Sequence, residues 1–514
     1  MFMPYLRETA SKSTQRIINF LGLNYSEQYQ DGEFSDTKNV TADNFPTISQ
    51  RRLRVKEGSY LNPSSLYSKA GLFVIDGTRV LHNGEHVGDV TEGEKQMVAV
   101  GNILVIFPDK KYYNAADKVF DSMEIEYTQA GLVFGTNDEG LSTITTTGDD
   151  FKFRVGDAIT ISGAEVAPEN NMSIIIRGVE GKVLTFYSNS FTEATEASEV
   201  TLKREVPDLD FICESNYRLW GCKDNTIYAS KYSDPLNFNV FDGLTSDSYY
   251  IQVGSDGDFT GCTPFSSHIC FFKEEVLHKL YGSKPSNYQV VTANVFGVQE
   301  GCSRTLCTIN ETLYYLGVHG VYAYTGGVPE LVSEKFGTKR FSMGAAGSDG
   351  EKYYISMKMY DGDWGLYVYD IRKNLWLRED DTHALDFANV EGDLYYINSS
   401  GELIRVNGNN ESSDEVIEWS VTFTPFNEVI NERKGYSQLG LRVELADKAW
   451  LKVEVRVDGG NWKQVYVNHN ERARILTIPI HPNRCDQFEV RLSGKGECKI
   501  KSLVRKFSIG SEVM

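Results

Sequence analysis

The stretch ETLYYLGVHGVYAYTGGVPELVS, residues 311 to 333, contains three short apolar segments separated by glycine-containing turns. The apolar positions are rich in Tyr, Val and Leu, and the turns fall at Gly317 to Gly320 and at Gly326-Gly327, which favours strands over a helix. Pro329 begins the third segment, where a missing backbone N–H is tolerated. The stretch predicts three consecutive strands joined by tight turns.

The same pattern recurs five times between residues 219 and 404, as a pair of apolar or aromatic doublets separated by short turns. The first doublets are Leu219-Trp220, Cys270-Phe271, Tyr314-Tyr315, Tyr353-Tyr354 and Tyr395-Tyr396, and the second are Ile227-Tyr228, Leu280-Tyr281, Val321-Tyr322, Leu366-Tyr367 and Leu403-Ile404. The second residues of the first set lie 51, 44, 39 and 42 positions apart. A period of roughly 40 to 50 residues is typical of a β-propeller, in which each repeat is one small antiparallel sheet. The alternative is an ordinary β-sandwich with tyrosine-rich strands.

A sixth repeat is predicted in MVAVGNILVIFPDKKYYNAA, residues 97 to 116, where Ile103 to Phe107 forms one strand and Tyr112-Tyr113 begins the next. The 115 residues from Val105 to Trp220 exceed one period by about 70, so we expect an insertion here. Its segments alternate apolar and polar residues around glycine turns, as the strands of a small barrel do. We predict a β-propeller of about six blades, with blades in residues 57–118 and 208–410 and a small β-barrel inserted at 119–207.

The two ends of the chain differ from the repeats. The polar stretch NGNNESSDE, residues 407 to 415, predicts a linker, and the period-2 segments around the turn Asp458-Gly459-Gly460 predict a β-sandwich over 411–514. Residues 1–56 are polar and acidic, with a short apolar cluster (Ile17, Ile18, Phe20, Leu21) and a basic run (Arg51, Arg52, Arg54, Lys56). They predict an N-terminal arm that clasps a neighbouring subunit or adaptor, the alternative being a frayed segment.

Composition limits the partners. The net charge of −19 argues against a protein that wraps nucleic acid, but an acidic channel would let DNA pass without sticking, and the same charge would also serve solubility alone. The sequence shows no secretory signal and no apolar run of the ~18 to 20 residues that a membrane-spanning helix needs. The cysteines form no C-x-x-C pair and are expected to be reduced and buried: Cys213, Cys222, Cys262, Cys270, Cys302, Cys307, Cys485 and Cys498.

The sequence predicts no catalytic, cofactor-binding or metal-ligating residue, no cofactor and no enzymatic activity. His82 and His86 flank the turn Asn83-Gly84 and are the one histidine pair close enough to consider for a metal, but two exposed turn histidines are the simpler interpretation. Three carboxylate pairs that a glycosidase would need fall in turns, where Asp is favoured for its hydrogen bonds to the backbone: Asp361 and Asp363, Asp380 and Asp381, Asp256 and Asp258. The last pair lies in GSDGDFTG, residues 254 to 261, which faintly resembles the Asp-box turn of sialidase propellers but lacks its tryptophan.

Five phrases carry a resemblance to a known family. They are FPTISQRRLR (45–54), VIFPDKKYYN (105–114), RLWGCKDNTIYASKYSDPLNF (218–238), CFFKEEVLHKLYGSKPSNYQV (270–290) and LYYLGVHGVYAYTGGVPELVSEKF (313–336). From about residue 40 to its end, the chain resembles virion proteins encoded by tailed phages of Gram-positive bacteria. These are similar in plan to the β-propeller tail nozzle or hub proteins of short-tailed phages, also called packaged-DNA stabilisation proteins.

The resemblance implies a structural protein of the phage tail that assembles in the host cytoplasm and resides in the virion. It implies a ring of copies of the chain, a hexamer, that continues the channel of the portal and head-tail adaptor. Such a ring retains packaged double-stranded DNA, conducts it at ejection without sequence-specific binding, and anchors tail fibres or spikes. The phrases are structural, so no site residue is transferred. Two alternatives are a propeller at the tail tip that binds host glycans through its 29 Tyr and 6 Trp, most of which we expect to be buried, and a glycan-cleaving tail enzyme.

Overall fold

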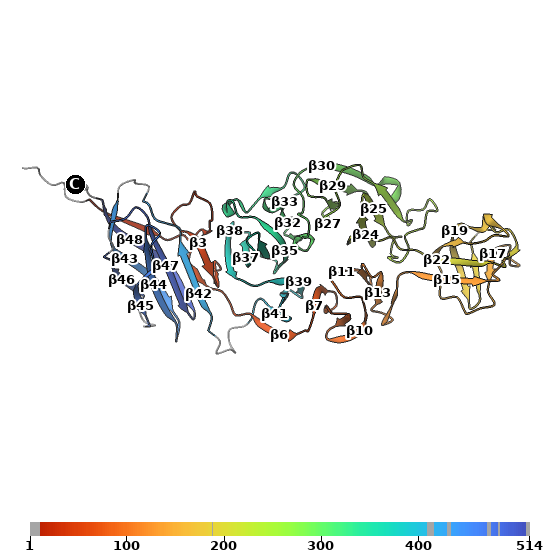
Figure 1. Cartoon of the computed structure of the whole chain (residues 1–514), viewed down its shortest axis with the longest axis horizontal. Helices are drawn as coiled ribbons and strands as arrows, with labels where there is room; N and C mark the ends of the chain where they lie inside the picture. The colour runs from red at the N-terminus through yellow and green to blue at the C-terminus, as the bar shows by residue number, and fades with distance from the viewer. Residues whose placement is uncertain are drawn as a thin grey trace, which may run out of the picture. The chain divides into compact units, whose positions relative to one another are not determined.

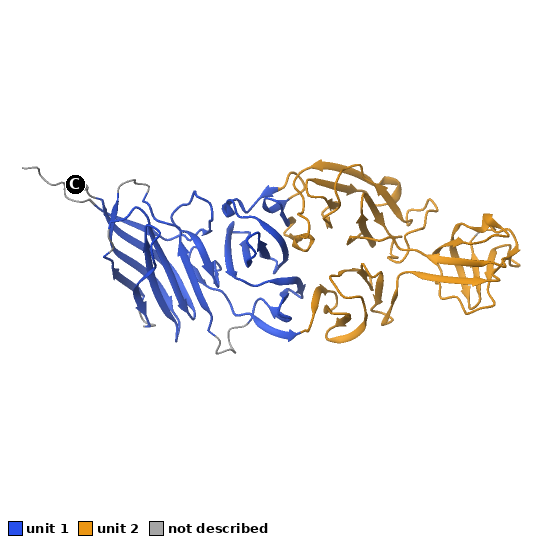
Figure 2. Cartoon of the chain, viewed as in Figure 1, with its two compact units in different colours: residues 1–59, 314–324, 330–514 blue, residues 60–313, 325–329 orange. Residues whose placement is uncertain are grey.

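The computed structural model describes residues 11–187, 189–408, 416–428, 433–469, 474–481 and 484–509 (Figure 1). Within these ranges the chain is all-β, and its helical elements are four single 3-10 turns: η1 (Pro168–Asn170), η2 (Pro285–Asn287), η3 (Ser303–Thr305) and η4 (Glu334–Phe336). No helix in the described ranges is long and apolar enough to cross a membrane. The chain divides into two compact units, residues 1–59, 314–324 and 330–514 (unit 1) and residues 60–313 and 325–329 (unit 2) (Figure 2).

Unit 2 contains four antiparallel sheets of four strands, each strand pairing with the next along the chain. The first two are β7 (Pro63–Ser68), β8 (Leu72–Asp76), β9 (Arg79–His82) and β10 (Glu85–Asp89), then β11 (Gln96–Val100), β12 (Ile103–Phe107), β13 (Lys111–Asn114) and β14 (Val119–Ser122). The other two are β23 (Phe211–Ser215), β24 (Arg218–Lys223), β25 (Thr226–Ala229) and β26 (Tyr249–Gln252), then β27 (Gly261–Phe265), β28 (His268–Phe272), β29 (Val276–Tyr281) and β30 (Gln289–Asn294). A buried apolar cluster lies between each sheet and the next.

Unit 1 contains two further sheets of this kind. They are β35 (Phe341–Ser348), β36 (Lys352–Met359), β37 (Trp364–Asp370) and β38 (Leu375–Asp380), then β39 (Ala384–Val390), β40 (Asp393–Asn398), β41 (Glu402–Arg405) and β6 (Val55–Ser59). A seventh sheet, whose residues fall in both units, consists of β31 (Cys307–Ile309), β32 (Thr312–Gly317), β33 (Gly320–Tyr324) and β34 (Glu330–Leu331). Small sheets packed face to face in succession are typical of a propeller-like fold.

The predicted repeats coincide with these sheets. All five first doublets lie on the second strand of a four-stranded sheet (β24, β28, β32, β36, β40), and all five second doublets lie on the third strand (β25, β29, β33, β37, β41). The segment Ile103–Phe107 is likewise the second strand of its sheet. The sheet β7–β10 corresponds to none of the six predicted repeats, so the described residues contain seven four-stranded sheets.

Residues 125–204 form a separate eight-stranded sheet in unit 2, in the order β15-β22-β18-β19-β20-β17-β16-β21. Its strands are β15 (Ile125–Ala130), β16 (Val133–Thr136), β17 (Ser142–Thr145), β18 (Ala158–Ser162), β19 (Ser173–Glu180), β20 (Val183–Phe186), β21 (Ala194–Thr195) and β22 (Glu199–Arg204). At its base, the buried guanidinium of Arg204 donates to both carboxylate oxygens of Asp157 at 2.8 Å and to the Met123 carbonyl at 2.9 Å. The side chains of Arg204 and Asp157 are 1% and 4% exposed, respectively. This buried ion pair holds the eight-stranded sheet in place where it joins the neighbouring sheet.

The C-terminal part of unit 1 consists of two six-stranded sheets. One contains β1 (Ser11–Ile17), β4 (Val40–Thr41), β5 (Ile48–Gln50), β43 (Lys434–Leu445), β46 (Ile475–Pro479) and β48 (Cys498–Ile509). The other contains β2 (Gly22–Leu23), β3 (Glu33–Lys38), β42 (Glu418–Phe423), β44 (Trp450–Val457), β45 (Lys463–Asn468) and β47 (Phe488–Lys495). The rings of Tyr436 and Phe488, one from each sheet, stack with centroids 4.1 Å apart. Most of the predicted linker, residues 409–415, lies outside the described residues.

The prediction of a free N-terminal arm is wrong for residues 11–56. These residues supply β1 to β5 of the two six-stranded sheets, and β6 pairs with β41, so the segment shares sheets with strands far along the chain. In the apolar cluster, Ile17 and Phe20 are only 4% and 2% exposed. The arm was predicted because β1, SKSTQRI, is a polar strand at the edge of its sheet and shows no alternation of apolar residues.

Three residues of the basic run, Arg51, Arg54 and Lys56, pair with carboxylates of their own chain. Arg54 donates to Glu379 at 2.5 Å and to Asp380 at 2.7 Å, and its guanidinium lies over the Tyr396 ring. Arg51 lies 3.6 Å from Glu379, and Lys56 forms an exposed ion pair with Glu402. These pairs join β38 and β41 to the N-terminal segment of the same chain.

Removing residues 1–56 is accordingly expected to destabilise the chain itself. The truncation deletes β-strands from three sheets, which exposes apolar surface. It also leaves the carboxylate of Glu379, which is 8% exposed, buried without its arginine partners. Circular dichroism and denaturant unfolding would measure the effect, with truncation at residue 10 as the control. A 1–56 truncation that unfolds at the same denaturant concentration as the full chain would contradict this interpretation.

Candidate functional site

The histidine pair considered for a metal does not converge. In the β9–β10 hairpin, His82 lies opposite Glu85. His86 is the residue after Glu85, so its side chain projects from the opposite face of the sheet to that of His82. His82 stacks on Phe73 with ring centroids 4.0 Å apart, while the Nε2 atom of His86 lies 3.0 Å from Asp89. The described residues contain no group of three or more His, Cys, Asp or Glu side chains arranged to hold a metal ion.

The three carboxylate pairs have structural partners or lie in exposed turns. Asp380 accepts hydrogen bonds from Arg54 and from the backbone N–H of Thr382, and Asp381 pairs with Arg378. The other two pairs occupy the turn between β36 and β37 and the exposed loop before β27: Asp361 and Asp363, Asp256 and Asp258. None of the six lines the hollow beside Phe241 and Tyr250 that is described below as the candidate site.

The segment 254–261 is held by a buried lysine from outside it, Lys273. Lys273 is 2% exposed, and its ammonium donates to the Ser255 carbonyl at 2.8 Å and to the Asn225 side chain. Beside it, buried His278 contacts the Ser255 hydroxyl through Nε2 at 2.8 Å and the Thr292 hydroxyl through Nδ1 at 2.9 Å. Burial, and the nearby charge of Lys273, lower the pKa of His278 to about 4.

This histidine is expected to make the fold sensitive to mild acid. Its pKa falls from 6.5 to about 4 on folding, so the unfolded chain binds more protons in that window and stability drops as the pH falls through it. The loss approaches roughly 3 kcal/mol below about pH 4. Urea unfolding of the parent and of His278→Gln at about pH 7 and about pH 4.5 would test it. The variant should lose less stability than the parent over this interval, and equal losses would contradict the assignment.

The candidate site is built on the long loop between β25 and β26, residues 230–248. Arg218, at the start of β24, is 1% exposed and donates to the carbonyls of Ser230 at 2.7 Å, Thr245 at 2.8 Å and Asp247. A charged donor buried among three carbonyls is satisfied only while the loop keeps this conformation. The carboxylate of Asp247 then accepts hydrogen bonds from the backbone N–H groups of Gly243 and Leu244 at 2.6 and 2.9 Å. These buried hydrogen bonds hold the loop in one conformation.

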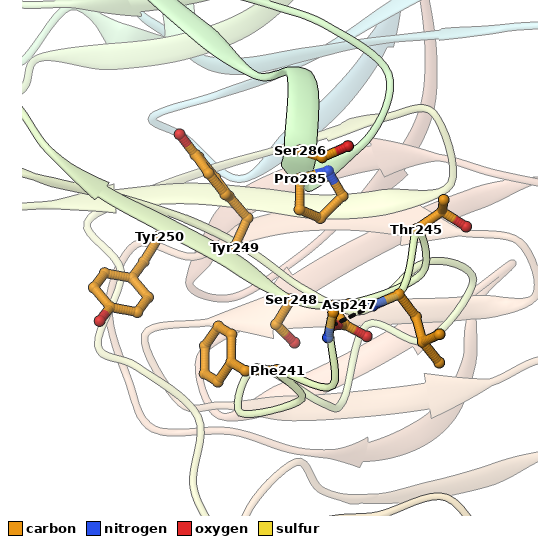
Figure 3. Close-up of a pocket in the computed structure, with 10 residues that line it drawn as sticks. Phe241, Thr245, Asp247, Ser248, Tyr249, Tyr250, Pro285 and Ser286 are labelled. Carbon is orange, nitrogen blue, oxygen red and sulfur yellow. Dashed lines mark hydrogen bonds between the residues drawn. The ribbon is translucent and has the colours of Figure 1, made fainter.

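A hollow of about 410 Å³ lies over this loop (Figure 3). It is lined by Phe241, Gly243, Leu244, Thr245, Asp247, Ser248, Tyr249, Tyr250, Pro285 and Ser286. The rings of Phe241 and Tyr250 lie at one side of it, 5.7 Å apart and nearly perpendicular, and Pro285 and Ser286 of η2 lie at another (Figure 3). Phe241 is 55% exposed and Tyr250 is 60% exposed. The two rings therefore present apolar surface to solvent on a fixed backbone.

Strand alternation explains why Tyr250 faces outward. On β26, Tyr249 turns inward and packs against Tyr288 and Trp220, with ring centroids 4.9 and 6.4 Å apart, so Tyr250 must project from the opposite face.

A second hollow of about 510 Å³ shares Phe241 and Tyr250 with the first. Its remaining lining is largely polar, and includes Lys110, Glu124, Lys203, Glu205, Asp208, Asn239 and Gln252. Lys110 lies 2.9 Å from Glu124 and 2.7 Å from Asp208, so its charge is already neutralised, and this pairing raises its pKa. The aromatic pair is thus a ridge between a mainly apolar hollow and a polar one.

The sequence alone does not identify this site. Most aromatic residues were expected to be buried, and the structure confirms this for Tyr314, Tyr315, Tyr353, Tyr354 and Tyr396. The available signal was the repeat spacing, because the longest interval, 51 residues between Trp220 and Phe271, contains the 230–248 loop. An enlarged loop on a regular scaffold is a common position for a binding site.

Comparisons with known proteins assign no family. No family model matches the chain, and no curated protein matches it. Among solved structures it is similar to the exo-β-1,3-galactanase of Phanerochaete chrysosporium with galactose, at 10% identity over 57% of this chain and 94% of that one (TM-score 0.23). It is similar to the endosialidase of phage phi92 at 11% identity over 79% and 70% (TM-score 0.24), and to Raptor of Chaetomium thermophilum at 11% over 70% and 29% (TM-score 0.32). At these TM-scores the likenesses assign neither a family nor a function.

Proposed function

We propose that the protein is a structural component of a bacteriophage tail, a ring-forming nozzle or hub of the virion. Six copies form the ring, continue the channel of the portal and adaptor, retain the packaged DNA and conduct it at ejection. In this proposal the four-stranded sheets are blades of one propeller. The insertion is a small barrel and the C-terminal sheets a sandwich, both of which make contacts with tail fibres, spikes or neighbouring subunits.

The observation that carries the proposal is that segments nearly 500 residues apart are built into shared sheets. Strand β1 pairs along β48 from Ser11 opposite Ile509 to Ile17 opposite Leu503, and β6 completes the sheet of β41. A strand paired along its whole length cannot fray without breaking its row of hydrogen bonds, which keeps both paired segments in place. Such a subunit is suited to a part that must hold pressurised DNA.

The charge of the chain supports a conduit that does not bind its cargo. Acidic groups repel phosphates over the screening length of about 10 Å, so a channel wall of net negative charge lets a duplex pass without sticking. The chain carries 71 Asp and Glu against 52 Lys and Arg. Within the basic run, Arg51 and Arg54 are paired with Glu379 and Asp380 of the same chain, so these two guanidinium groups are not available for counterion-releasing contacts with DNA.

A nonsense mutation in the phage gene for this chain tests the proposal. Particles assembled without the protein are expected to lose their packaged DNA, which electron microscopy of heads and nuclease sensitivity of the DNA would show, and supply of the protein in trans should restore full heads. Filled, infectious particles that lack the chain would contradict the proposal.

A further inference from the structure

We propose that the ridge formed by Phe241 and Tyr250, with the hollows on its two sides, is a binding site for a neutral oligosaccharide. Sugar rings would stack on the two aromatic side chains, and their hydroxyl groups would meet the polar residues of the second hollow. All residues of the site lie within unit 2. The sugar-binding inference can therefore be tested independently of the proposed tail function.

The aromatic pair has the properties of a stacking platform. Two large rings that are more than half exposed cost free energy in water, and the chain holds them there through a buried scaffold of hydrogen bonds. Each has two side-chain torsions, so ordering them on a ligand costs little conformational entropy. A sugar ring offers an apolar face of C–H groups, which suits an aromatic surface of this kind.

The second hollow supplies the groups that hydroxyls need. Asn239 and Gln252 each carry an amide that both donates and accepts hydrogen bonds, and Glu205 and Glu124 accept them. Glu205 forms only a long ion pair with the Lys203 ammonium, 3.7 Å away, so its carboxylate can still accept hydrogen bonds from a ligand. Polar groups beside an apolar surface are typical of sites that orient a small polyhydroxylated ligand.

Charge selects against an anionic ligand. The second hollow is lined by three carboxylates and two lysines, and the Lys110 ammonium is already shared between Glu124 and Asp208. A sulfated or carboxylated sugar would bring a further negative charge to a lining whose three carboxylates outnumber its two lysines, and each lysine already faces a carboxylate. A neutral sugar avoids that penalty.

Size favours an oligosaccharide over a single sugar. Hollows of about 410 and 510 Å³ each fall in the range of small-molecule sites. Because both share Phe241 and Tyr250, a ligand that fills them must cross the ridge, and each ring can then contact a different sugar unit.

Calorimetric titration of the full chain tests the inference, with maltotetraose, cellotetraose and chitotetraose as probes and a heparin tetrasaccharide as the anionic comparison. We expect at least one neutral probe to bind with a Kd below about 1 mM and the anionic one to bind at least about tenfold more weakly. Tyr250→Ala and Phe241→Ala should each weaken binding by about tenfold or more. Both side chains are exposed, so the melting temperature should stay near that of the parent. Tyr187→Ala, at a 63% exposed tyrosine that lines neither hollow, is the matched control and should bind normally.

Three results would overturn the inference. These are no binding of any neutral probe up to about 10 mM, equal binding by the parent and both ridge variants, or tighter binding of the anionic probe. A ridge that docks a protein instead would also show no binding of any sugar probe. Ring assembly of Tyr250→Ala reports on the tail function separately, because the ridge is not part of the shared sheets.

Discussion

Replacing Arg505 by Leu is expected to lower the free energy of unfolding by about 3 to 5 kcal/mol. Arg505 lies on β48 and is fully buried, and its guanidinium contacts Glu428 at 2.9 Å and Asp31 at 2.7 Å. It also stacks over the Phe426 ring at 3.8 Å. Glu428 is only 3% exposed, so the variant leaves a buried carboxylate without its counter-charge. Chemical unfolding followed by circular dichroism would measure the loss.

The double variant Arg505→Leu with Glu428→Leu distinguishes the cost of leaving the Glu428 carboxylate unpaired from the cost of lost packing. If the unpaired carboxylate dominates, the second substitution should recover most of the stability, because an apolar pair of similar volume replaces an ion pair at little cost. A single variant within about 0.5 kcal/mol of the parent would show that this cluster does not fasten the C-terminal strand to the N-terminal segment.

Replacing Trp220 by Ala is expected to cost about 3 to 5 kcal/mol as well, through a cavity between two sheets of unit 2. Trp220 is 1% exposed and packs edge-on against Tyr288, with ring centroids 5.1 Å apart, and against Phe271 of β28. Its indole N–H donates to the Ser215 carbonyl at 3.2 Å. Thermal unfolding would report the loss, and Trp220→Phe should recover part of it because the ring fills much of the cavity.

The Trp220 variant also bears on the candidate site. Tyr249 packs against Trp220 and Tyr288, so loss of the indole frees Tyr249 and loosens β26, which carries Tyr250. Tyr217→Ala is the matched control, since that ring is 59% exposed and lies in the adjoining turn. Comparable destabilisation by both variants would contradict a core role for Trp220.

The repeats were predictable because every doublet contains at least one buried residue within a strand. Tyr314-Tyr315 and Tyr353-Tyr354 lie on strands whose neighbours are buried on both faces, and such strands appear as continuous apolar runs in any sequence. The β7–β10 sheet lies within the range 57–118 predicted for the first blades, but it was not counted as a separate repeat because its outer strand β10, EHVGD, is short and polar.

The N-terminal segment and the aromatic hollow could not be derived in the same way. Strand β1 pairs with β48 nearly 500 residues away, a long-range contact that the polar residues of SKSTQRI do not signal. The exposure of Phe241 and Tyr250 depends on the conformation of a 19-residue loop, which is fixed by one buried arginine, Arg218, and three carbonyls. Backbone carbonyls leave no trace in a sequence, so only the structure brings these groups together.

The measurement that tests the central proposal most directly is class averaging of negatively stained particles of the purified protein, with the mass determined by light scattering on the same sample. The proposal predicts rings with an open centre and a mass of about 347 kDa, which is six copies of the 57.9 kDa chain. Monodisperse particles of about 58 kDa that also fail to form rings on the purified portal and adaptor would contradict it.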